Sequence, residues 1–393
     1  MKKILIDCSL TSGRGPSKKT AEFVWECQKM KVKYFLVADV KTASILSELG
    51  ITPNKIIKTK LSEQNEKIYE TFRKEFKDID FDFLIKFGAR PVGPYIAKEK
   101  NIPYVIVDGG FPDRYESYPS LYDKRTYIKA NKIIITTNFP WKAKYPSFLK
   151  NIEICYFPIS AKTKKYLTLL RRMDKEKIVQ EIEKFLTSFP KNYDLIFNLN
   201  MTDDYIASRS RVTYGAWLTT KQYDQTVGFI RRLITDLGNF ASNKKIVFIS
   251  DNKISKVCLD LYKDFKNIYS VTWRNNWNYY AEIAIAAICD VAVCRAANYQ
   301  PFQFTLSRGN NITTAVPADG YMNEDEAAIQ AAALGLTYNI IYDDEEYIKK
   351  LFSFLQNKTL INEISKKQKR NFKDFGEKNN TIKSLFKVVK SNF

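Results

Sequence analysis

The sequence contains no histidine among its 393 residues. This absence excludes a histidine general base, a Ser-His-Asp triad and any metal site built on imidazole ligands. Cysteine is scarce as well, and the six cysteines form no Cys-x-x-Cys pair. Several of them stand in apolar stretches, so we expect reduced thiols in the core of a cytosolic protein, not a disulfide framework.

Long apolar runs are also missing, and no stretch reaches the roughly eighteen residues that a membrane-spanning helix needs. The N-terminus has two lysines before a short apolar segment, but Asp7 interrupts that segment. We therefore expect a first buried strand there and not a signal peptide. The expected location is the cytoplasm, with the inner face of the membrane as the alternative.

Positive charge, in contrast, is in excess. Lys and Arg number 63 against 43 Asp and Glu, which gives a formal net charge of +20. A field of this sign favours polyanionic partners such as nucleic acid, an anionic membrane surface or a phosphorylated acceptor. The alternative is that lysine simply fills solvated faces, and composition does not separate the two.

Short apolar stretches alternate with helical patterns such as Thr20–Met30 and Glu63–Phe76, which is typical of parallel sheets covered on both faces. The predicted strands are Lys3–Cys8, Tyr34–Ala38, Lys55–Lys58, Phe83–Phe87, Tyr104–Val107, Lys132–Thr136, Ile152–Phe157, Leu195–Leu199, Lys245–Ser250, Ile268–Thr272, Val291–Cys294, Ile312–Val316 and Tyr338–Tyr342. The length and the alternation predict an α/β protein of two Rossmann-like, doubly wound domains that face each other across a cleft. The expected parts are a first domain 1–160, a helical connector 161–192, a second domain 193–345 and C-terminal helices 346–393, with a possible return of the last helix to the first domain.

The segment 268–343 is the most informative part of the chain. It consists of a strand Ile268–Thr272, an aromatic-polar loop Trp273–Trp277, an Ala-rich helix, a strand ending at Arg295, a strand ending in Val316-Pro317 and an Ala-rich helix opened by Asn323. This order resembles the C-terminal domain of GT-B glycosyltransferases, in particular the group that contains MurG and the UDP-glycosyltransferases. The resemblance implies a GT-B fold, a nucleoside-diphosphate sugar as donor, UDP-linked in this group, and transfer without a metal or a separate cofactor.

In that family, a strand and a turn of small residues lead into a helix that holds the donor diphosphate. Arg295, Ala297 and Asn298 stand at this place, and small side chains allow backbone N–H groups and a helix N-terminus to approach phosphate closely. Gln303 lies near the position where the family has an acidic residue that holds the ribose. The alternative for the whole segment is an ordinary turn between strand and helix.

Three further places match the donor-binding pattern. Asp319, Asn323 and Glu324 resemble the segment that meets the donor sugar, although acidic residues also favour a helix start without any ligand. Trp273 and Arg274 follow a strand where the family holds the nucleobase, and packing between domains is the alternative. Thr202 lies in a loop where GT-B enzymes often contact the phosphates.

The acceptor side is expected in the first domain. Gly13, Arg14, Gly15 and Ser17 link the first strand to the first helix; the glycines permit a tight loop, and Ser17 is typical of a helix N-cap. The family places a histidine in this loop, which this chain lacks, so a catalytic base must come from elsewhere.

Asp108 follows the predicted strand Tyr104–Val107 and precedes two glycines. The carboxyl ends of parallel strands face the ligand crevice of an α/β domain. A carboxylate there can take a proton from an acceptor hydroxyl, so Asp108 is the first candidate for the base and Asp113 the second. The alternative is an aspartate whose carboxylate accepts backbone N–H groups in a turn.

These features favour a glycosyltransferase that moves a sugar from a nucleoside-diphosphate sugar to an acceptor hydroxyl. The charge suggests a polyanionic acceptor, either modified DNA or a cell-envelope lipid or polymer. A sugar-nucleotide epimerase or hydrolase of the same fold is one alternative. A non-catalytic nucleic-acid-binding protein on a GT-B-like fold is the other.

Overall fold

The computed structural model divides the chain into two compact units. Unit 1 comprises residues 1–164, 212–215 and 375–393, and unit 2 comprises residues 165–211 and 216–374. The structure describes residues 3–10, 14–59, 65–88, 92–109, 124–199, 220–250, 252–274, 277–293, 313–316, 324–341 and 346–392. Within these ranges, no helix is long and apolar enough to cross a membrane.

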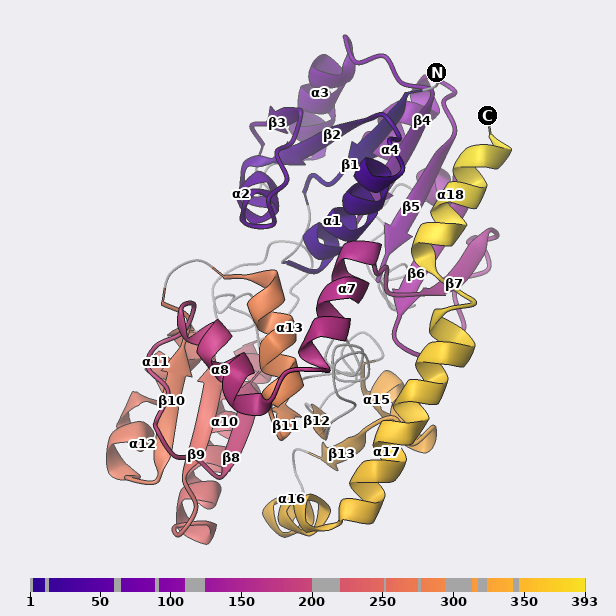
Figure 1. Ribbon diagram of the computed structural model, residues 1–393. Coiled ribbons are helices and arrows are strands. Elements are labelled where there is room, and N and C mark those ends of the chain that lie inside the picture. Colours follow the sequence, from indigo (N-terminus) through magenta and orange to yellow (C-terminus); the bar gives the residue numbers. More distant parts are fainter. Residues whose placement is uncertain are drawn as a thin grey trace. The chain divides into compact units, whose positions relative to one another are not determined.

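Unit 1 contains a seven-stranded parallel sheet in the order β3-β2-β1-β4-β5-β6-β7 (Figure 1). Its strands are β1 (Ile4–Asp7), β2 (Tyr34–Asp39), β3 (Lys55–Ile57), β4 (Phe83–Phe87), β5 (Tyr104–Asp108), β6 (Lys132–Thr137) and β7 (Ile152–Tyr156). Its helices are α1 (Arg14–Lys29), α2 (Val40–Glu48), α3 (Asn65–Phe76), α4 (Val92–Glu99), α6 (Lys124–Lys129) and α18 (Thr381–Ser391). The strand order reverses between β1 and β4, so a topological switch point lies at their carboxyl ends.

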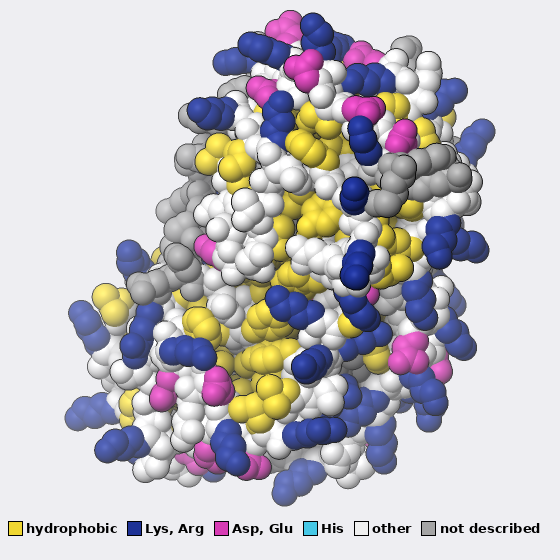
Figure 2. Space-filling model, turned by 45° about the horizontal axis from the view of Figure 1, so that its top comes forward, with side chains coloured by type: hydrophobic (Ala, Val, Ile, Leu, Met, Phe, Trp, Pro, Cys, Tyr) yellow, Lys and Arg dark blue, Asp and Glu magenta, His cyan; other side chains and the backbone are white. Residues whose placement is uncertain are grey.

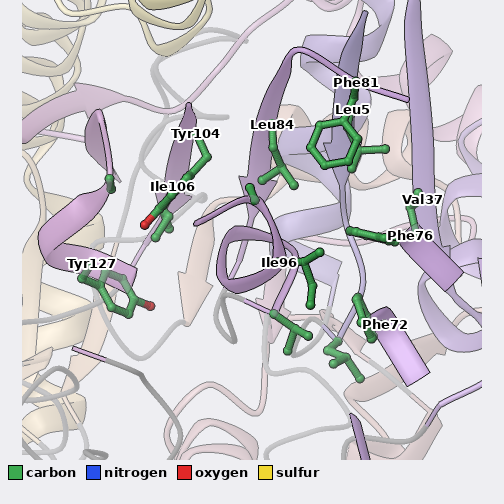
Figure 3. Packing of buried hydrophobic residues seen from close by; sticks show 14 of the residues in the cluster. Leu5, Val37, Phe72, Phe76, Phe81, Leu84, Ile96, Tyr104, Ile106 and Tyr127 are labelled. Atoms are coloured by element: carbon green, nitrogen blue, oxygen red, sulfur yellow. The ribbon is translucent and has the colours of Figure 1, made fainter. Parts of the chain in front are cut away.

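Alternate residues of the strands face opposite sides of this sheet. One side, which includes Leu5, Leu84 and Ile106, packs against α3, α4 and α6 in a single apolar cluster (Figure 3). On the other side, the ring of Phe23 in α1 lies 5.9 Å from that of Phe87 and 5.2 Å from that of Phe386 in α18. The sheet is therefore covered on both faces, as the uninterrupted apolar strands predict.

Unit 2 contains a parallel sheet in the order β10-β9-β8-β11 and a parallel pair of β12 and β13. The strands are β8 (Leu195–Leu199), β9 (Ile246–Ser250), β10 (Ile268–Thr272), β11 (Val291–Val293), β12 (Thr313–Val316) and β13 (Tyr338–Ile341). The helices are α8 (Lys175–Glu183), α10 (Thr220–Phe240), α11 (Asn252–Val257), α12 (Leu259–Asp264), α13 (Tyr279–Ile288), α15 (Glu324–Ala333), α16 (Tyr347–Gln356) and α17 (Lys358–Asn371). A π-helical turn, η3 (Phe372–Gly376), follows α17, and α7 (Ala161–Leu170) leads from unit 1 into unit 2. All thirteen predicted strands are confirmed, with ends that differ by one residue at most.

The last helix, α18, packs on the edge of the sheet in unit 1. The hydroxyl of Thr381 donates a hydrogen bond of 2.6 Å to the carbonyl of Tyr156 at the end of β7. The hydroxyl of Ser384 donates one of 2.5 Å to the carboxylate of Glu153. Residues 375–393 are thus part of unit 1, although more than two hundred residues separate these partners in the sequence.

The cysteines that the structure describes are all buried and unpaired: Cys8, Cys27, Cys155, Cys258 and Cys289. Burial raises the pKa of the Cys8 and Cys155 thiols from about 9 to about 12. The thiolate is the species that reacts with alkylating reagents, and its fraction at pH 8 falls on the order of a thousandfold with such a shift. These positions therefore match the prediction of reduced core thiols.

Alkylation by iodoacetamide at pH 8 tests this result. We expect Cys8 and Cys155 to react at least about a hundredfold more slowly in the native protein than in urea, as measured by mass spectrometry of the modified peptides. Native rates equal to the rates in urea would contradict the burial of these thiols.

Candidate functional site

The carboxyl edge of the unit 1 sheet carries a group of buried charged residues. Asp7, Asp39, Lys86 and Asp108 come from the ends of four neighbouring strands and are almost inaccessible to solvent. By the alternation of the strands, all four share the side of the sheet that α4 covers. Charged groups are rarely buried without a partner, so their contacts define what this edge can do.

At the switch point, Asp7 and Lys86 lie directly opposite each other in the parallel pair of β1 and β4. Their side chains are fully buried, and Nζ of Lys86 lies 3.5 Å from Oδ1 of Asp7. The ammonium also donates a hydrogen bond to the carbonyl of Ser9, while the amide and the hydroxyl of Ser9 donate to Oδ1 of Asp7 at 2.9 and 2.5 Å. The pair thus holds both sides of the turn that follows β1.

The second oxygen of this carboxylate, Oδ2 of Asp7, is buried without a hydrogen-bond partner. It lies against the start of α4, where a Cβ atom on Gly93 would approach it to 2.3 Å. Glycine is required at this position because any larger residue would displace the carboxylate or the helix.

Asp39 holds the same turn from the β2 side. Its carboxylate accepts hydrogen bonds from the backbone amides of Thr42 at 2.9 Å and of Leu10 at 2.5 Å. One side chain therefore both caps α2 and fixes the turn after β1. Leu10 has a φ of 51°, which is unfavourable for a leucine and is maintained by the surrounding contacts. In dinucleotide-binding domains an acidic residue in this region binds a ribose. In this protein both carboxylate oxygens of Asp39 instead accept hydrogen bonds from the protein backbone.

Asp108 ends β5 and is 2% exposed. Its carboxylate accepts the amide of Gly109 at 2.7 Å, and its carbonyl accepts the hydroxyl of Thr136 at 3.0 Å. Burial raises the pKa of the Tyr145 phenol, and the negative charge of Asp108 raises it further, so Tyr145 remains a protonated neighbour of this carboxylate. The position at the strand end is the predicted one, and the Gly109 contact is the local backbone bond expected of an aspartate in a turn.

Lys19 of α1 lies against the backbone beside Asp108. A Cβ atom on Gly109 would lie 2.7 Å from Nζ of Lys19, so the absence of a side chain leaves room for the ammonium. Lys18 and Lys19 are only 5% and 6% exposed. Lysines are seldom buried to this degree, and both of these take part in interactions within the protein.

The start of α1 differs from the prediction for Ser17. The helix begins at Arg14, so Arg14, Gly15 and Ser17 belong to its first turns and not to a loop, and Ser17 is not the N-cap. Pro16 is compatible with this earlier start because its missing N–H falls where a helix has no internal acceptor. The hydroxyl of Ser17 is buried and has no hydrogen-bond partner.

In unit 2, Trp273 and Arg274 follow β10 as predicted. The backbone of this loop is held by the segment after α8: the amide of Arg274 donates to the carbonyl of Phe185 at 3.0 Å, and Trp273 pairs with Leu186 in an antiparallel bridge. The side chain of Trp273 is half-buried, whereas that of Arg274 is exposed.

Trp277, at the other end of this loop, is a buried residue. It is 4% exposed, and its indole N–H donates a hydrogen bond of 2.9 Å to Glu282 in α13. Glu324 is the first residue of α15, where the sequence predicts a helix start.

The other predicted site residues lie outside the described residues: Gly13, Asp113, Thr202, Arg295, Ala297, Asn298, Gln303, Asp319 and Asn323. Their assignments stay predictions from the sequence. In the part of the chain that the structure does describe, no three Cys, Asp or Glu side chains are grouped as metal ligands would be.

Sequence reasoning did not identify Lys86, Asp39 or Lys19. A signal was present for Lys86, because it is the one charge inside the apolar strand Phe83–Phe87. Such a residue is buried by its neighbours and needs a buried partner of opposite charge. The partner is not visible in the sequence, since the two residues are separated by 79 positions.

Solved structures resemble this chain over its whole length. MurG from Acinetobacter baumannii matches with a TM-score of 0.57 and 11% identity, covering 100% of both chains. UDP-GlcNAc 2-epimerase from Neisseria meningitidis, bound to UDP-GlcNAc, matches with a TM-score of 0.60 and 13% identity, covering 99% of this chain and 100% of the other. HepE from Anabaena, in complex with UDP and glucose, matches with a TM-score of 0.58 and 10% identity, covering 100% of both.

No protein-family model and no curated protein sequence matches the chain. At identities of 10% to 13%, the structural similarity establishes the architecture and not the reaction. Together with the parallel sheets of the two units, it shows that this chain has the GT-B fold, similar to that of MurG and the UDP-glycosyltransferases.

Proposed function

We propose that this protein is a glycosyltransferase that moves a sugar from a nucleoside-diphosphate sugar, UDP-linked, to an acceptor hydroxyl. The observation that carries the proposal is the full-length GT-B similarity to structures whose bound ligands are UDP or a UDP-sugar. No metal is needed in the proposed reaction, because helix N-termini and cationic side chains supply the charge that stabilises a leaving diphosphate. From the sequence, Arg295 and the small residues after it are the proposed donor site.

On the acceptor side, Asp108 is the proposed general base. It stands at the end of β5, at the edge where α/β domains bind ligands, and its carboxylate is fixed by the Gly109 amide. In the proposed step, the acceptor oxygen attacks the anomeric carbon, its proton passes to the Asp108 carboxylate, and the bond from that carbon to the diphosphate breaks. Lys19 stands beside the backbone of Gly109, the residue that follows Asp108.

The start of α1 supports an acceptor that carries negative charge. Its first turn has no acidic residue, and Arg14, Lys18 and Lys19 put three cations at the positive end of the helix. A helix N-terminus with cationic side chains around it is a general binding site for an anion. The buried hydroxyl of Ser17, which has no protein partner, provides a donor for such an anion.

Epimerisation of a UDP-sugar is the second candidate. A UDP-GlcNAc 2-epimerase is among the full-length structural matches, and a putative one from Listeria monocytogenes has a TM-score of 0.63. The epimerase needs no acceptor, whereas the transferase does. The products formed from a UDP-sugar therefore separate the two candidates.

A thermal-shift screen with UDP, GDP, TDP and their sugars tests the donor class. A ligand at about a hundred times its Kd stabilises the folded state by about 2.7 kcal/mol, so UDP or a UDP-sugar is expected to raise the melting temperature by several degrees. Arg295→Ala is expected to remove the shift, and Arg171→Ala, which removes a charge elsewhere in unit 2, serves as the control. A screen in which no nucleoside diphosphate changes the melting temperature contradicts the proposal.

Chromatography of the reaction products then identifies the reaction. Release of UDP that depends on an added acceptor supports transfer. A changed UDP-sugar without acceptor supports the epimerase, and free sugar with UDP in the absence of acceptor supports a hydrolase.

A further inference from the structure

A group of hydroxyl side chains lies inside unit 2, where α11 and α12 cover one side of the sheet (Figure 1). Most Lys and Arg side chains that the structure describes are exposed, as Figure 2 shows for one face of the molecule. The hydroxyl side chains are instead buried or half-buried. We name this group the hydroxyl cluster, and it consists of Ser250, Ser255, Tyr262 and Ser270.

Four different elements bring these hydroxyls together. Ser250 ends β9, and Ser270 lies in the neighbouring strand β10, opposite Phe248 in the parallel register. Because side chains alternate along a strand, Ser250 and Ser270 project from the same side of the sheet as Phe248. Ser255 belongs to α11 and Tyr262 to α12, and both helices contact β10. The rings of Tyr262 and Phe248 lie 6.4 Å apart, so the tyrosine packs on this side of the sheet.

Only two of the four hydroxyls bond to each other. The oxygens of Ser255 and Ser270 are 2.8 Å apart, which is the usual length of a hydrogen bond between hydroxyls. The hydroxyls of Ser250 and Tyr262 are also buried, but they make no hydrogen bond with any residue that the structure describes. Ser250 is 2% exposed, so bulk solvent does not reach its hydroxyl.

The phenol of Tyr262 nevertheless lies close to two of the serines. Burial raises the pKa of Tyr262, and the hydroxyls of Ser270 and Ser250 lower it in part. A neutral hydroxyl acts on a phenol in this way only over a short distance, so the three oxygens are near one another. Oxygens that lie close together without a direct bond are the usual setting of a bridging water molecule.

The surroundings of the cluster make a hydrated site more stable than a dry one. Ile254 and Cys258, on the same two-helix segment, are fully buried in the apolar core of the unit. An unpaired hydroxyl in such a core is costly, and native interiors seldom contain one. A buried water needs about two to four polar partners, and the cluster offers the hydroxyls of Ser250, Tyr262 and Ser270.

We propose that the hydroxyl cluster binds one buried water molecule that bridges the hydroxyls of Ser250 and Tyr262. A hydroxyl can both donate and accept a hydrogen bond, and so can water, so one molecule satisfies both groups. The hydroxyl of Ser270 is the third partner. This water links the end of β9 to α12 in the interior of unit 2.

The hydrated cluster supports the backbone at the end of β10. The bond between Ser270 and Ser255 extends the network from the strand to α11. This helix begins at Asn252, whose side-chain amide donates a hydrogen bond of 3.1 Å to the carbonyl of Trp273. The water therefore belongs to the set of contacts that fix the loop after β10, whatever ligand this loop binds.

A crystal structure of the full-length protein at a resolution that shows ordered water tests the site directly. We expect a water oxygen at about 2.8 Å from both Oγ of Ser250 and the phenol oxygen of Tyr262. A direct hydrogen bond between these two hydroxyls would overturn the proposal. Density that shows both side chains but no water bonded to them would overturn it as well.

Tyr262→Phe distinguishes a hydrated cluster from a dry one by the direction of its effect. If the phenol is bonded to water, the variant loses a hydrogen bond, and the opening equilibrium of β9 and β10 should increase about fivefold. If the cluster is dry, the variant loses only an unpaired polar group, and the equilibrium should stay the same or decrease. Hydrogen exchange of peptides from the two strands measures this equilibrium, and Ser250→Ala should change it in the same direction.

Tyr269→Phe is the matched control. Tyr269 precedes Ser270 in β10 and is half-buried on the opposite side of the sheet, so its phenol is not part of the cluster. This variant should change the opening equilibrium less than about twofold. An effect of Tyr269→Phe as large as that of Tyr262→Phe would contradict a specific water site. No nucleotide or sugar is present in these measurements, so their outcome is independent of the transferase proposal.

Discussion

Asp108→Asn is expected to lower the rate of sugar transfer by about 10²- to 10⁴-fold, the usual contribution of a general base. Asparagine keeps the shape of the side chain, and its Oδ1 still accepts the Gly109 amide that lies 2.7 Å from the carboxylate. The substitution therefore removes the proton acceptor and leaves the turn after β5 in place. Steady-state kinetics with a UDP-sugar measures the expected loss of kcat. Calorimetry of UDP binding verifies that the donor affinity is unchanged.

Two further variants make this result specific. Asp113→Asn tests the second candidate, and a large loss there with little change in Asp108→Asn would reassign the base. Gly109→Ala introduces a Cβ atom 2.7 Å from Nζ of Lys19 and should displace the ammonium without removing any charge. If Lys19 assists Asp108, this alanine variant should lower kcat with the nucleotide affinity unchanged. A general loss of folding would instead lower both.

The strands could be predicted because each one is an apolar stretch between helical patterns. Phe83–Phe87 is an example: the stretch Phe-Leu-Ile-Lys-Phe is long enough for one strand only, and the structure gives the same bounds. In a parallel sheet covered on both faces, the strands show no alternation of apolar and polar residues. The short apolar run itself then indicates the strand. The strand Ile268–Thr272 could be predicted for the same reason, because it is a short apolar run directly before the aromatic loop.

Contacts between distant residues could not be predicted in the same way. Asp7 and Lys86 become partners only because β1 and β4 are neighbours, and the order of strands in a sheet is a tertiary property. Local signals can also mislead. Ser17 has the chemistry of an N-cap, but the helix begins at Arg14 because the Gly15-Pro16 segment accepts helical geometry in a first turn.

The basic composition pointed to an anionic partner but not to a place on the molecule. The structure separates the cations into groups with different environments: Lys18 and Lys19 of α1 are buried, whereas Lys366 and Lys369 are exposed on α17. A buried ammonium needs a partner inside the fold, whereas an exposed one stays in contact with solvent. A net charge of +20 alone does not distinguish these environments.

Lys86→Met is expected to destabilise unit 1 by about 3–5 kcal/mol, because it leaves the buried Asp7 carboxylate without its countercharge. Both side chains are fully buried, and the ammonium also satisfies the Ser9 carbonyl. The double variant Asp7→Asn with Lys86→Met carries no buried charge and should recover a large part of the loss. A chain of two units has no single defined unfolding midpoint. The change in the free energy of unfolding of unit 1 is therefore measured by hydrogen exchange of peptides from β1 and β4 at increasing urea concentration.

An exposed ion pair in the same unit provides the comparison. Nζ of Lys3 lies 2.5 Å from the carboxylate of Asp80, and these side chains are 59% and 80% exposed. Because water screens this pair, Lys3→Met should change the exchange of β1 very little. If Lys86→Met is as stable as the wild type, or if the double variant is less stable than Lys86→Met alone, the buried pair does not hold the turn after β1. The turn would then depend on Asp39 alone, whose carboxylate already binds the Leu10 amide.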